Sequence, residues 1–328
     1  MLIASAAILV GFIILIWSAD LFVAGAAAIA ENLGMSPVLI GLTIVSLGTS
    51  APEVLVSINA ALADAGEIAI GNAIGSNLAN MGMVLGIVAL VAPLPVHRNR
   101  LKRELPTLLA VTLGCGLLLL DLELDWVDGL LMLGALAFIL IEMIRSQAHD
   151  PNAAEEAGVE ELPHLRPVRA WISFVIGLIM LIMSSELLVW GATNIALELG
   201  VSPLVIGLSV LAVGTSLPEL AASLASAVKG HAEIALGNVL GSNLFNLLGV
   251  MSIPGLFETQ RLGSEVLYRD YAAMLGLTLL LAAGLYSTLL RKPAADGTAA
   301  DCSVGRGSGT LFLVLYALYY YWLFQTAR

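Results

Sequence analysis

The sequence predicts an all-α membrane protein with ten transmembrane helices, built as two inverted five-helix repeats. Three observations predict this fold. The 328 residues are 59% hydrophobic and only 12% charged, which is too apolar for a soluble fold of this size. Apolar runs long enough to cross a bilayer recur along the whole chain. A polar motif also occurs twice, five runs apart. A soluble enzyme, a nucleic-acid binder and a disordered scaffold are therefore excluded.

The apolar runs give the helices in order. The first is followed by two runs that glycine, proline and polar residues interrupt, then by a short fourth run and an uninterrupted fifth, and the same sequence of features begins again. Helices are expected because a span in lipid must satisfy its own backbone hydrogen bonds. The ten predicted spans lie near 2–29, 37–62, 67–92, 105–120, 126–145, 170–198, 203–228, 233–254, 270–290 and 310–325.

Basic residues orient the chain. With the N-terminus outside, eleven of the fourteen Lys and Arg residues fall in segments on the inner side, which is the preferred side for positive charge. The polar segment 146–169 then becomes a cytoplasmic linker between a first five-helix repeat, 1–145, and a second, 170–328. We expect a multi-pass protein of the cytoplasmic (inner) membrane.

An internal repeat covers the interrupted helices. SPVLIGLTIVSLGTSAPE at 36–53 matches SPLVIGLSVLAVGTSLPE at 202–219, and EIAIGNAIGSNLAN at 67–80 matches EIALGNVLGSNLFN at 233–246, always 166 residues apart. The shared residues are mainly Gly, Ser, Thr, Pro, Asn and Glu, which membrane spans usually avoid. Because the copies are five spans apart, they are expected to cross the membrane in opposite directions, as in secondary transporters. The repeated motif regions are 36–86 and 202–252.

The motif GTSxPE offers oxygen ligands. Its proline removes a backbone donor and kinks the helix, so that carbonyls near Ser46 and Ala212 are expected to lose their partners. Thr and Glu stand four residues apart and share a helix face in both copies. The neighbouring helices carry polar stripes with the same spacing. The stripes are Asn72, Ser76 and Asn80, and Asn238, Ser242 and Asn246. We expect these elements to enclose one central oxygen-lined site.

Two carboxylates set the charge of this predicted site. Glu53 and Glu219 lie within apolar spans, and no Lys or Arg falls in the interior of any predicted span to pair with them. A buried carboxylate in a membrane usually marks an ion pathway, so its counter-charge should be a cation or a proton. Carboxylate, hydroxyl, amide and carbonyl oxygens suit Ca²⁺ or Na⁺ rather than a soft transition metal. Asp20 and Glu186 form a second duplicated acidic pair, whose role the sequence leaves open.

At these residues the sequence resembles the cation/Ca²⁺ exchanger superfamily, and specifically the prokaryotic sodium/calcium exchanger proteins, over its whole length. The resemblance rests on GTSAPE with GNAIGSNLAN and on GTSLPE with GNVLGSNLFN. It implies an antiporter that exchanges Ca²⁺ for Na⁺ by alternating access, with three Na⁺ per Ca²⁺. No cofactor is implied. The expected partners are the two ions and the lipid bilayer, with the protein acting as a monomer.

The resemblance also implies ligands. The Ca²⁺ site would use Glu53 and Glu219 with the backbone carbonyls of Thr49 and Thr215. The Na⁺ sites would use hydroxyl groups and two carbonyls, from Thr49, Ser50, Ser76, Thr215, Ser216, Ser242, Ser46 and Ala212. Asn80 and Asn246 would border the centre. Because neither is Asp, the potassium-dependent branch is disfavoured.

Two alternatives remain open. The glutamates could carry protons, which would make the protein a Ca²⁺/H⁺ or broader divalent cation/proton antiporter, because desolvation raises a carboxylate pKa. A cation channel or a non-transporting sensor could share the repeat. An intramembrane enzyme is disfavoured, because the predicted spans contain no nucleophile with a matching His or Lys base.

Overall fold

The computed structural model describes residues 1–96, 98–147, 165–200, 212–289 and 302–326. The chain divides into two compact units, unit 1 and unit 2. Unit 1 consists of Met1–Pro52 and Ile141–Asn238, and unit 2 consists of Glu53–Leu140 and Val239–Arg328. Each unit therefore draws on both halves of the sequence repeat. The repeat halves 1–145 and 170–328 themselves stay a prediction, and most of the predicted linker lies outside the described residues.

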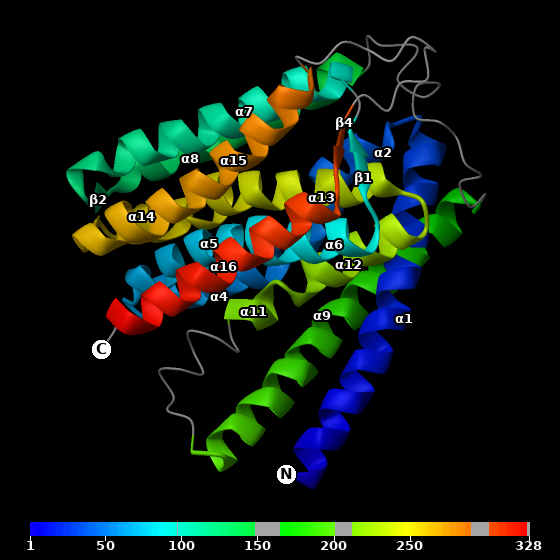
Figure 1. Ribbon diagram of the computed structural model, residues 1–328, viewed down its shortest axis with the longest axis horizontal. Helices are drawn as coiled ribbons and strands as arrows, with labels where there is room; N and C mark the ends of the chain where they lie inside the picture. Colours follow the sequence, from blue (N-terminus) through cyan, green and yellow to red (C-terminus); the bar gives the residue numbers. More distant parts are fainter. Residues whose placement is uncertain (97, 148–164, 201–211, 290–301, 327–328) are drawn as a thin grey trace. The chain divides into compact units, whose positions relative to one another are not determined.

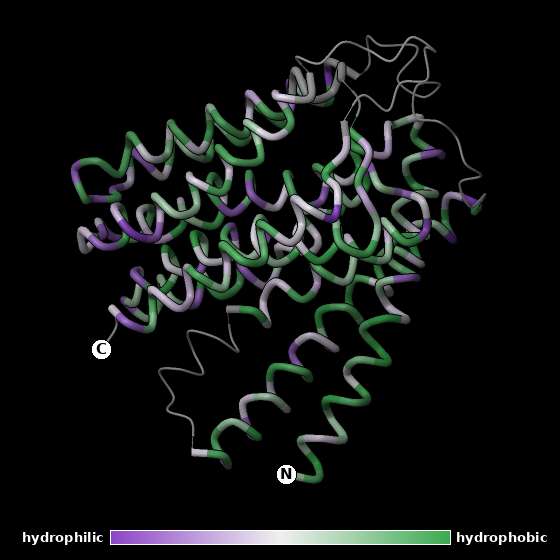
Figure 2. The backbone as a smooth tube through the Cα atoms, in the orientation of Figure 1, coloured by the Kyte–Doolittle hydropathy of each residue, from purple (hydrophilic) through white to green (hydrophobic). Residues whose placement is uncertain are grey.

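Unit 1 is dominated by two long helices, α1 (Leu2–Leu33) and α9 (Pro167–Glu198), which lie side by side in Figure 1. Figure 2 shows α1 as hydrophobic along most of its length. The remaining elements of this unit are short and carry the two copies of GTSxPE. They are α2 (Pro37–Ile40), the π-helix η1 (Gly41–Val45), α3 (Ser46–Thr49), α11 (Ala212–Thr215) and α12 (Leu217–Val228).

Glycines set the antiparallel crossing of α1 and α9. A Cβ at Gly11 would meet Leu188, and a Cβ at Gly177 would meet Phe22. The same holds nearer the helix ends, where Gly25 lies against Phe174 and Gly191 lies against Ile8. Gly11 and Gly177 are 166 residues apart, as are Gly25 and Gly191. Each glycine of α1 that contacts a large residue of α9 therefore has an equivalent glycine on α9 that contacts a large residue of α1.

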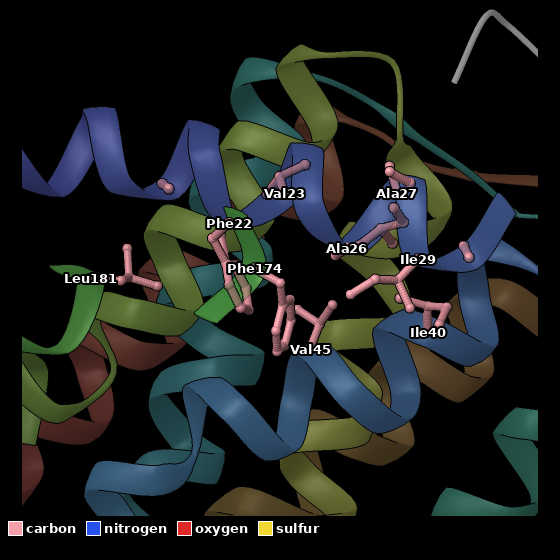
Figure 3. Close-up of a cluster of buried hydrophobic side chains, with 14 of the residues drawn as sticks. Phe22, Val23, Ala26, Ala27, Ile29, Ile40, Val45, Phe174 and Leu181 are labelled. Carbon is pink, nitrogen blue, oxygen red and sulfur yellow. The ribbon is translucent and has the colours of Figure 1, made fainter. Parts of the chain in front are cut away.

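The apolar core of unit 1 lies where α1 faces α9 and the η1 segment. Phe22 and Phe174 stack with ring centroids 4.8 Å apart, and Leu181 and Val45 are buried with them (Figure 3). Small residues of α1 belong to the same buried cluster, notably Ala26, Ala27, Ala28 and Ala30. Burial of this apolar surface holds the short motif elements against the long helix pair.

Helix ends follow the repeat as well. Gly34 and Gly200, 166 residues apart, take positive φ angles of 63° and 81° where α1 and α9 end. Ser36 then caps α2 by accepting the Leu39 N–H at 3.3 Å. Such stops allow the chain to reverse within a few residues.

Unit 2 contains most of the remaining spans. On its first segment lie α4 (Ala51–Leu62, which begins in unit 1), α5 (Gly66–Ala79), the π-helix η2 (Asn80–Val84), α6 (Leu85–Val91), α7 (Arg98–Leu118), the 3₁₀ turn η3 (Leu119–Asp121) and α8 (Trp126–Gln147, which ends in unit 1). On its second lie α13 (Ala232–Phe245, which begins in unit 1), the π-helix η5 (Asn246–Val250), α14 (Ser252–Phe257), the π-helix η6 (Val266–Tyr271), α15 (Ala272–Leu289) and α16 (Arg306–Thr326).

Two short antiparallel ribbons join loops of unit 2. In the first, β1 (Leu94–Val96) pairs with β4 (Cys302–Val304), with Leu94 opposite Val304 (Figure 1). In the second, β2 (Glu123–Leu124) pairs with β3 (Gln260–Arg261). Each ribbon links two helix ends that are far apart in the sequence.

The spans agree with the prediction in type and in most boundaries. Among the described residues, eight helices are long and apolar enough to cross a membrane, and Pro37–Thr49 with Ala51–Leu62 gives a ninth as one bent span. The predicted span 203–228 lies partly outside the described residues. Its described part is α11 and α12. An all-helical membrane protein is confirmed, whereas the tenth span stays a prediction.

One expectation about charge is wrong. The ninth predicted span, 270–290, begins earlier, at Val266, and so includes Arg269. This arginine is tolerated because it forms a bidentate ion pair with its neighbour Asp270. Arg269 Nε donates to Asp270 Oδ1 at 2.7 Å, and Arg269 Nη2 donates to Asp270 Oδ2 at 3.0 Å. Tyr319 of α16 donates a further hydrogen bond to Asp270 at 3.0 Å. The pair is neutral as a whole, which lowers its desolvation penalty.

Candidate functional site

Glu219 is held in unit 1 at the start of α12. It follows Pro218 in the first helical turn, where a missing backbone N–H breaks no helical hydrogen bond. Its side chain is fully buried, and the Ser50 hydroxyl donates to its Oε1 at 3.1 Å. The Ser of the first GTSxPE motif therefore contacts the Glu of the second.

Asn238 ties the same elements together. The Thr49 hydroxyl donates to Asn238 Oδ1 at 3.1 Å, and Asn238 Nδ2 donates to the Ser223 hydroxyl at 2.9 Å. The same amide lies 3.4 Å from the backbone carbonyl of Glu219. These side chains are buried, so the network fixes Thr49 beside the Glu219 turn. We call Thr49, Ser50, Glu219, Ser223 and Asn238 the Glu219 set.

The helix breaks differ from expectation in their hydrogen bonding. The Ser46 carbonyl keeps a partner, because it accepts the Ser50 N–H at 2.9 Å, so the expected loss of that partner is wrong for Ser46. In the second copy, the Ser216 N–H donates to the Val213 carbonyl at 3.2 Å. A carbonyl oxygen has two lone pairs, so Ser46 and Ala212 both stay predicted ligands.

A carbonyl released by Pro218 finds a partner on α9. In a regular helix, the N–H of residue 218 would bond to the carbonyl of Gly214. Because proline has no N–H, that carbonyl needs another donor. The Ser185 hydroxyl supplies it at 2.8 Å. Ser185 thus fastens the broken helix to the long helix pair of unit 1.

Glu53 is held in unit 2 at the start of α4. Its side chain is fully buried, and neither carboxylate oxygen has a hydrogen-bond partner among the described residues. The Ser76 side chain of α5 lies beside it. Asn72 Nδ2 lies 3.4 Å from the Glu53 backbone carbonyl, the same relationship that Asn238 has to Glu219. A buried carboxylate with so few donors needs a proton or a cation.

Asn80 and Asn246 open two π-helices of unit 2. η2 begins at Asn80 and η5 begins at Asn246, so the wider turn occurs at equivalent places in the repeat. Both side chains are fully buried, and all four of their amide atoms lack hydrogen-bond partners among the described residues. The same is true of the Ser242 hydroxyl. π-turns often occur at functional sites, where they redirect side chains and carbonyls. We call Glu53, Asn72, Ser76, Asn80, Ser242 and Asn246 the Glu53 set.

Each predicted site residue lies in one of the two units. Unit 1 brings Thr49, Ser50 and Glu219 into one network and carries Ser46, Ala212, Thr215 and Ser216 on the same short helices. Thr215 and Ser216 are buried. Unit 2 carries the other predicted residues, on α4, α5, η2, α13 and η5. The single central site stays a prediction.

The sequence reasoning missed three hydrogen-bonding serines, one in the Glu219 set and two outside both sets. Ser223 accepts the Asn238 amide, Ser57 donates to the Val250 carbonyl at 3.0 Å, and Ser185 donates to Gly214. Ser57 and Ser223 could have been found, because each follows its glutamate by four residues and occurs in both copies. Ser185 had no such signal, because its partner is far away in the sequence.

The chemistry available is that of hard oxygen ligands. No group of three or more His, Cys, Asp and Glu residues that could hold a metal occurs in the described part of the chain. A cation held here would therefore use a carboxylate together with neutral hydroxyl, amide and carbonyl oxygens. Such ligands suit Na⁺ and Ca²⁺. The fold and these buried carboxylates define a polytopic membrane protein of the ion-transporting class.

Comparisons with known proteins agree with this class. The sequence profile of the family "Sodium/calcium exchanger protein" matches residues 3–145 and 169–325. The relative named "Putative antiporter CaxA", from Alkalimonas amylolytica, is 42% identical over 99% of this chain and 100% of its own. "Inner membrane protein YrbG", from Escherichia coli K12, is 35% identical over 86% of this chain and 88% of its own.

A solved structure has the same fold. The sodium-calcium exchanger NCX_Mj, soaked with Na⁺ and Sr²⁺, superimposes with a TM-score of 0.80 at 32% identity, over 97% of each chain. The chain therefore belongs to the sodium/calcium exchanger family. It is a membrane ion antiporter and not an enzyme.

Proposed function

We propose that the protein exchanges Ca²⁺ for Na⁺ across a cytoplasmic membrane by alternating access. The observation that carries this proposal is the pair of buried, repeat-related glutamates, each at the start of a helix broken by GTSxPE. Glu219 is oriented by the Ser50 hydroxyl, whereas the Glu53 oxygens lack partners among the described residues. Both arrangements suit carboxylates that receive a cation.

The ligands that we propose come from both sets. Glu53 and Glu219 bind Ca²⁺, together with the carbonyls of Thr49 and Thr215. Na⁺ is bound by hydroxyl and carbonyl oxygens of the same short helices, from Thr49, Ser50, Ser76, Thr215, Ser216, Ser242, Ser46 and Ala212. Asn80 and Asn246 line the site through amide oxygens. The partnerless amide atoms of these asparagines and the Ser242 hydroxyl support this assignment.

The proposed stoichiometry of three Na⁺ per Ca²⁺ would make exchange move net charge. Two carboxylates neutralise one Ca²⁺, whereas three Na⁺ on the same carboxylates leave one positive charge. If three Na⁺ exchange for one Ca²⁺, each cycle moves net charge and responds to membrane voltage. The absence of Asp at positions 80 and 246 limits the proposed site to two negative charges.

The architecture that we propose is ten spans in two inverted repeats, with the N-terminus outside and the segment 146–169 in the cytoplasm. The antiparallel packing of α1 and α9, with equivalent glycines 166 residues apart, supports the inversion. The relative named as an inner membrane protein supports the membrane assigned. We propose that the monomer is the transporting unit, because the proposed ligands all come from one chain.

The test is uptake of ⁴⁵Ca²⁺ into proteoliposomes under separately imposed Na⁺, K⁺ and pH gradients. We expect uptake only when Na⁺ is loaded inside. Uptake should be faster when valinomycin and K⁺ make the vesicle interior positive, because each cycle then moves one positive charge outward, down the potential. Uptake driven by a pH step without Na⁺ would instead identify a Ca²⁺/H⁺ antiporter. Uptake without any imposed gradient of a coupling ion, at a rate set by Ca²⁺ alone, would identify a channel.

A further inference from the structure

Asp20 is a carboxylate on an otherwise apolar face of α1. It follows Ile16 by four residues and Trp17 by three, so the three share one side of the helix. Ile16 and Trp17 are 66% and 54% exposed, as expected of side chains that face lipid. A carboxylate on this face is costly unless it is neutralised.

Glu186 occupies the equivalent place on α9, 166 residues later. It shares its side of the helix with Met183 and Trp190, both exposed. The glycine contacts of α1 with α9 place the centre of the crossing between Ile16 and Trp17 on α1 and between Ile182 and Met183 on α9. Asp20 and Glu186 each lie about 5 Å along the helix from this centre, in opposite directions. They are therefore symmetry-related acids in the middle of the helix pair.

Lys229 neutralises one of these two acids. It caps the C-terminal end of α12, the helix that begins beside Glu219. Its Nζ lies 3.0 Å from Asp20 Oδ1 and also donates to the Asp20 backbone carbonyl at 3.1 Å. The ammonium thus takes two oxygen partners from a single residue of α1. The contact joins α1 to the far end of the helix that carries a site carboxylate.

The repeat cannot form this contact twice. The residue 166 positions before Lys229 is Ala63, which has no charge to offer. In the part of the chain that the structure describes, no ion pair involves Glu186. Of the two acids related by the repeat, Asp20 therefore has a basic partner and Glu186 has none among the described residues. The partner of Asp20 is a single lysine.

We propose that Lys229 is a tethered counter-cation that latches α1 to α12 in one end state of the transport cycle. This inference rests on the proposed alternating access, in which inverted repeats exchange their conformations. A contact that only one repeat can make then stabilises one end state and not its mirror image. The latch biases the equilibrium between inward-open and outward-open forms, and it opens when α12 moves relative to α1.

The first test restrains the contact reversibly. In a C115A/C302S background, D20C and K229C are joined with a short bis-methanethiosulfonate linker, and Na⁺-driven ⁴⁵Ca²⁺ uptake is measured before linking, after linking and after reduction. We expect exchange before linking, loss after it and recovery with dithiothreitol. Unchanged exchange in the linked protein would overturn the latch, and so would a complete loss of exchange in the unlinked protein. Absence of Na⁺-driven exchange in the wild type would instead contradict the proposed function.

The second test measures the bias. The KM for Ca²⁺ is determined at each face, in right-side-out and inside-out vesicles, for D20N, K229M and the double variant. We expect each to shift the ratio of the two KM values by about two- to fivefold, the range for one exposed ion pair, and the double variant to shift it no further. E186Q is the matched control, and its effect should add to that of K229M. Additive effects of D20N and K229M would overturn the latch.

Discussion

The Ser50 hydroxyl donates a hydrogen bond to Glu219 Oε1 at 3.1 Å, although the two residues are 169 positions apart. Ser50 follows Thr49 at the break between α3 and α4, and Glu219 lies in the first turn of α12. One copy of the GTSxPE motif thus holds the carboxylate of the other. The Glu219 carboxylate is therefore positioned by residues from both copies of the motif.

Loss of either carboxylate should abolish exchange. E53Q and E219Q keep the shape of the side chain but remove the negative charge that we propose neutralises Ca²⁺. We expect no Na⁺-driven ⁴⁵Ca²⁺ uptake by either variant, with normal insertion and a normal size-exclusion profile. E67Q, which changes an exposed glutamate in the first turn of α5, is the control and should transport normally. Full transport by E53Q or E219Q would contradict the assigned ligands.

Removal of the Ser50 hydroxyl should weaken ion binding without unfolding the protein. A hydrogen bond to a charged group contributes about 1.5–3 kcal/mol, so S50A should raise the Na⁺ concentration for half-maximal exchange by about tenfold or more. Ser18 provides the control, because among the described residues its buried hydroxyl donates only to the Leu15 carbonyl of its own helix. If S50A and S18A behave alike, the Ser50 contact does not serve transport.

The asparagines of the π-helices should show opposite effects on stability and transport. A buried amide without partners destabilises a fold by about 1–3 kcal/mol, so N80L and N246L should melt at the same temperature as the wild type or higher. Both should lose exchange, because leucine has no oxygen to offer a cation. Melting is followed in detergent by intrinsic fluorescence and exchange in proteoliposomes. Normal exchange by either variant would show that its amide only fills space.

Close backbone contact in unit 1 should make two glycines sensitive to substitution. A Cβ at Gly41 would lie 2.6 Å from the Ile234 carbonyl, and one at Gly237 would lie 2.5 Å from the Val38 carbonyl. G41A and G237A should each destabilise the protein by about 1–3 kcal/mol through overpacking. The measurement is the melting temperature in detergent.

Gly114 of α7 is the matched control for these glycine variants. Nothing in the described part of the chain lies within 4 Å of a Cβ at this position. G114A should therefore leave the melting temperature unchanged or raise it slightly, because alanine favours a helix more than glycine does. Equal losses in G41A, G237A and G114A would show that the close contact is not the cause.

The sequence predicted the broken helices well because their cause is local. Pro52 and Pro218 stand at the same place in each motif, and both helices break one residue before α4 or α12 begins, at Ser50 and Ser216. The buried glutamates were equally easy to predict, because an acidic residue within an apolar membrane span is rare and usually functional. Local chemistry of this kind can be read from a single chain.

Other features depend on contacts between distant segments. The π-turns at Asn80 and Asn246 change the hydrogen-bond register without a distinctive residue pattern. The network from Thr49 through Asn238 to Ser223 requires helices from both repeats to meet. Arg269 was placed outside its span because hydropathy treats charges singly, whereas Asp270 neutralises it. Packing decided each of these points.

The glycine contacts between α1 and α9 also limit how these helices can move. Gly11 and Gly25 of α1 receive Leu188 and Phe174, while Gly177 and Gly191 of α9 receive Phe22 and Ile8. Sliding one helix along the other by a turn, about 5.4 Å, would drive large side chains against backbone at several points together. The two helices are therefore expected to move together as one rigid body. A displacement at one end of the pair is then transmitted to the other end without sliding between the helices.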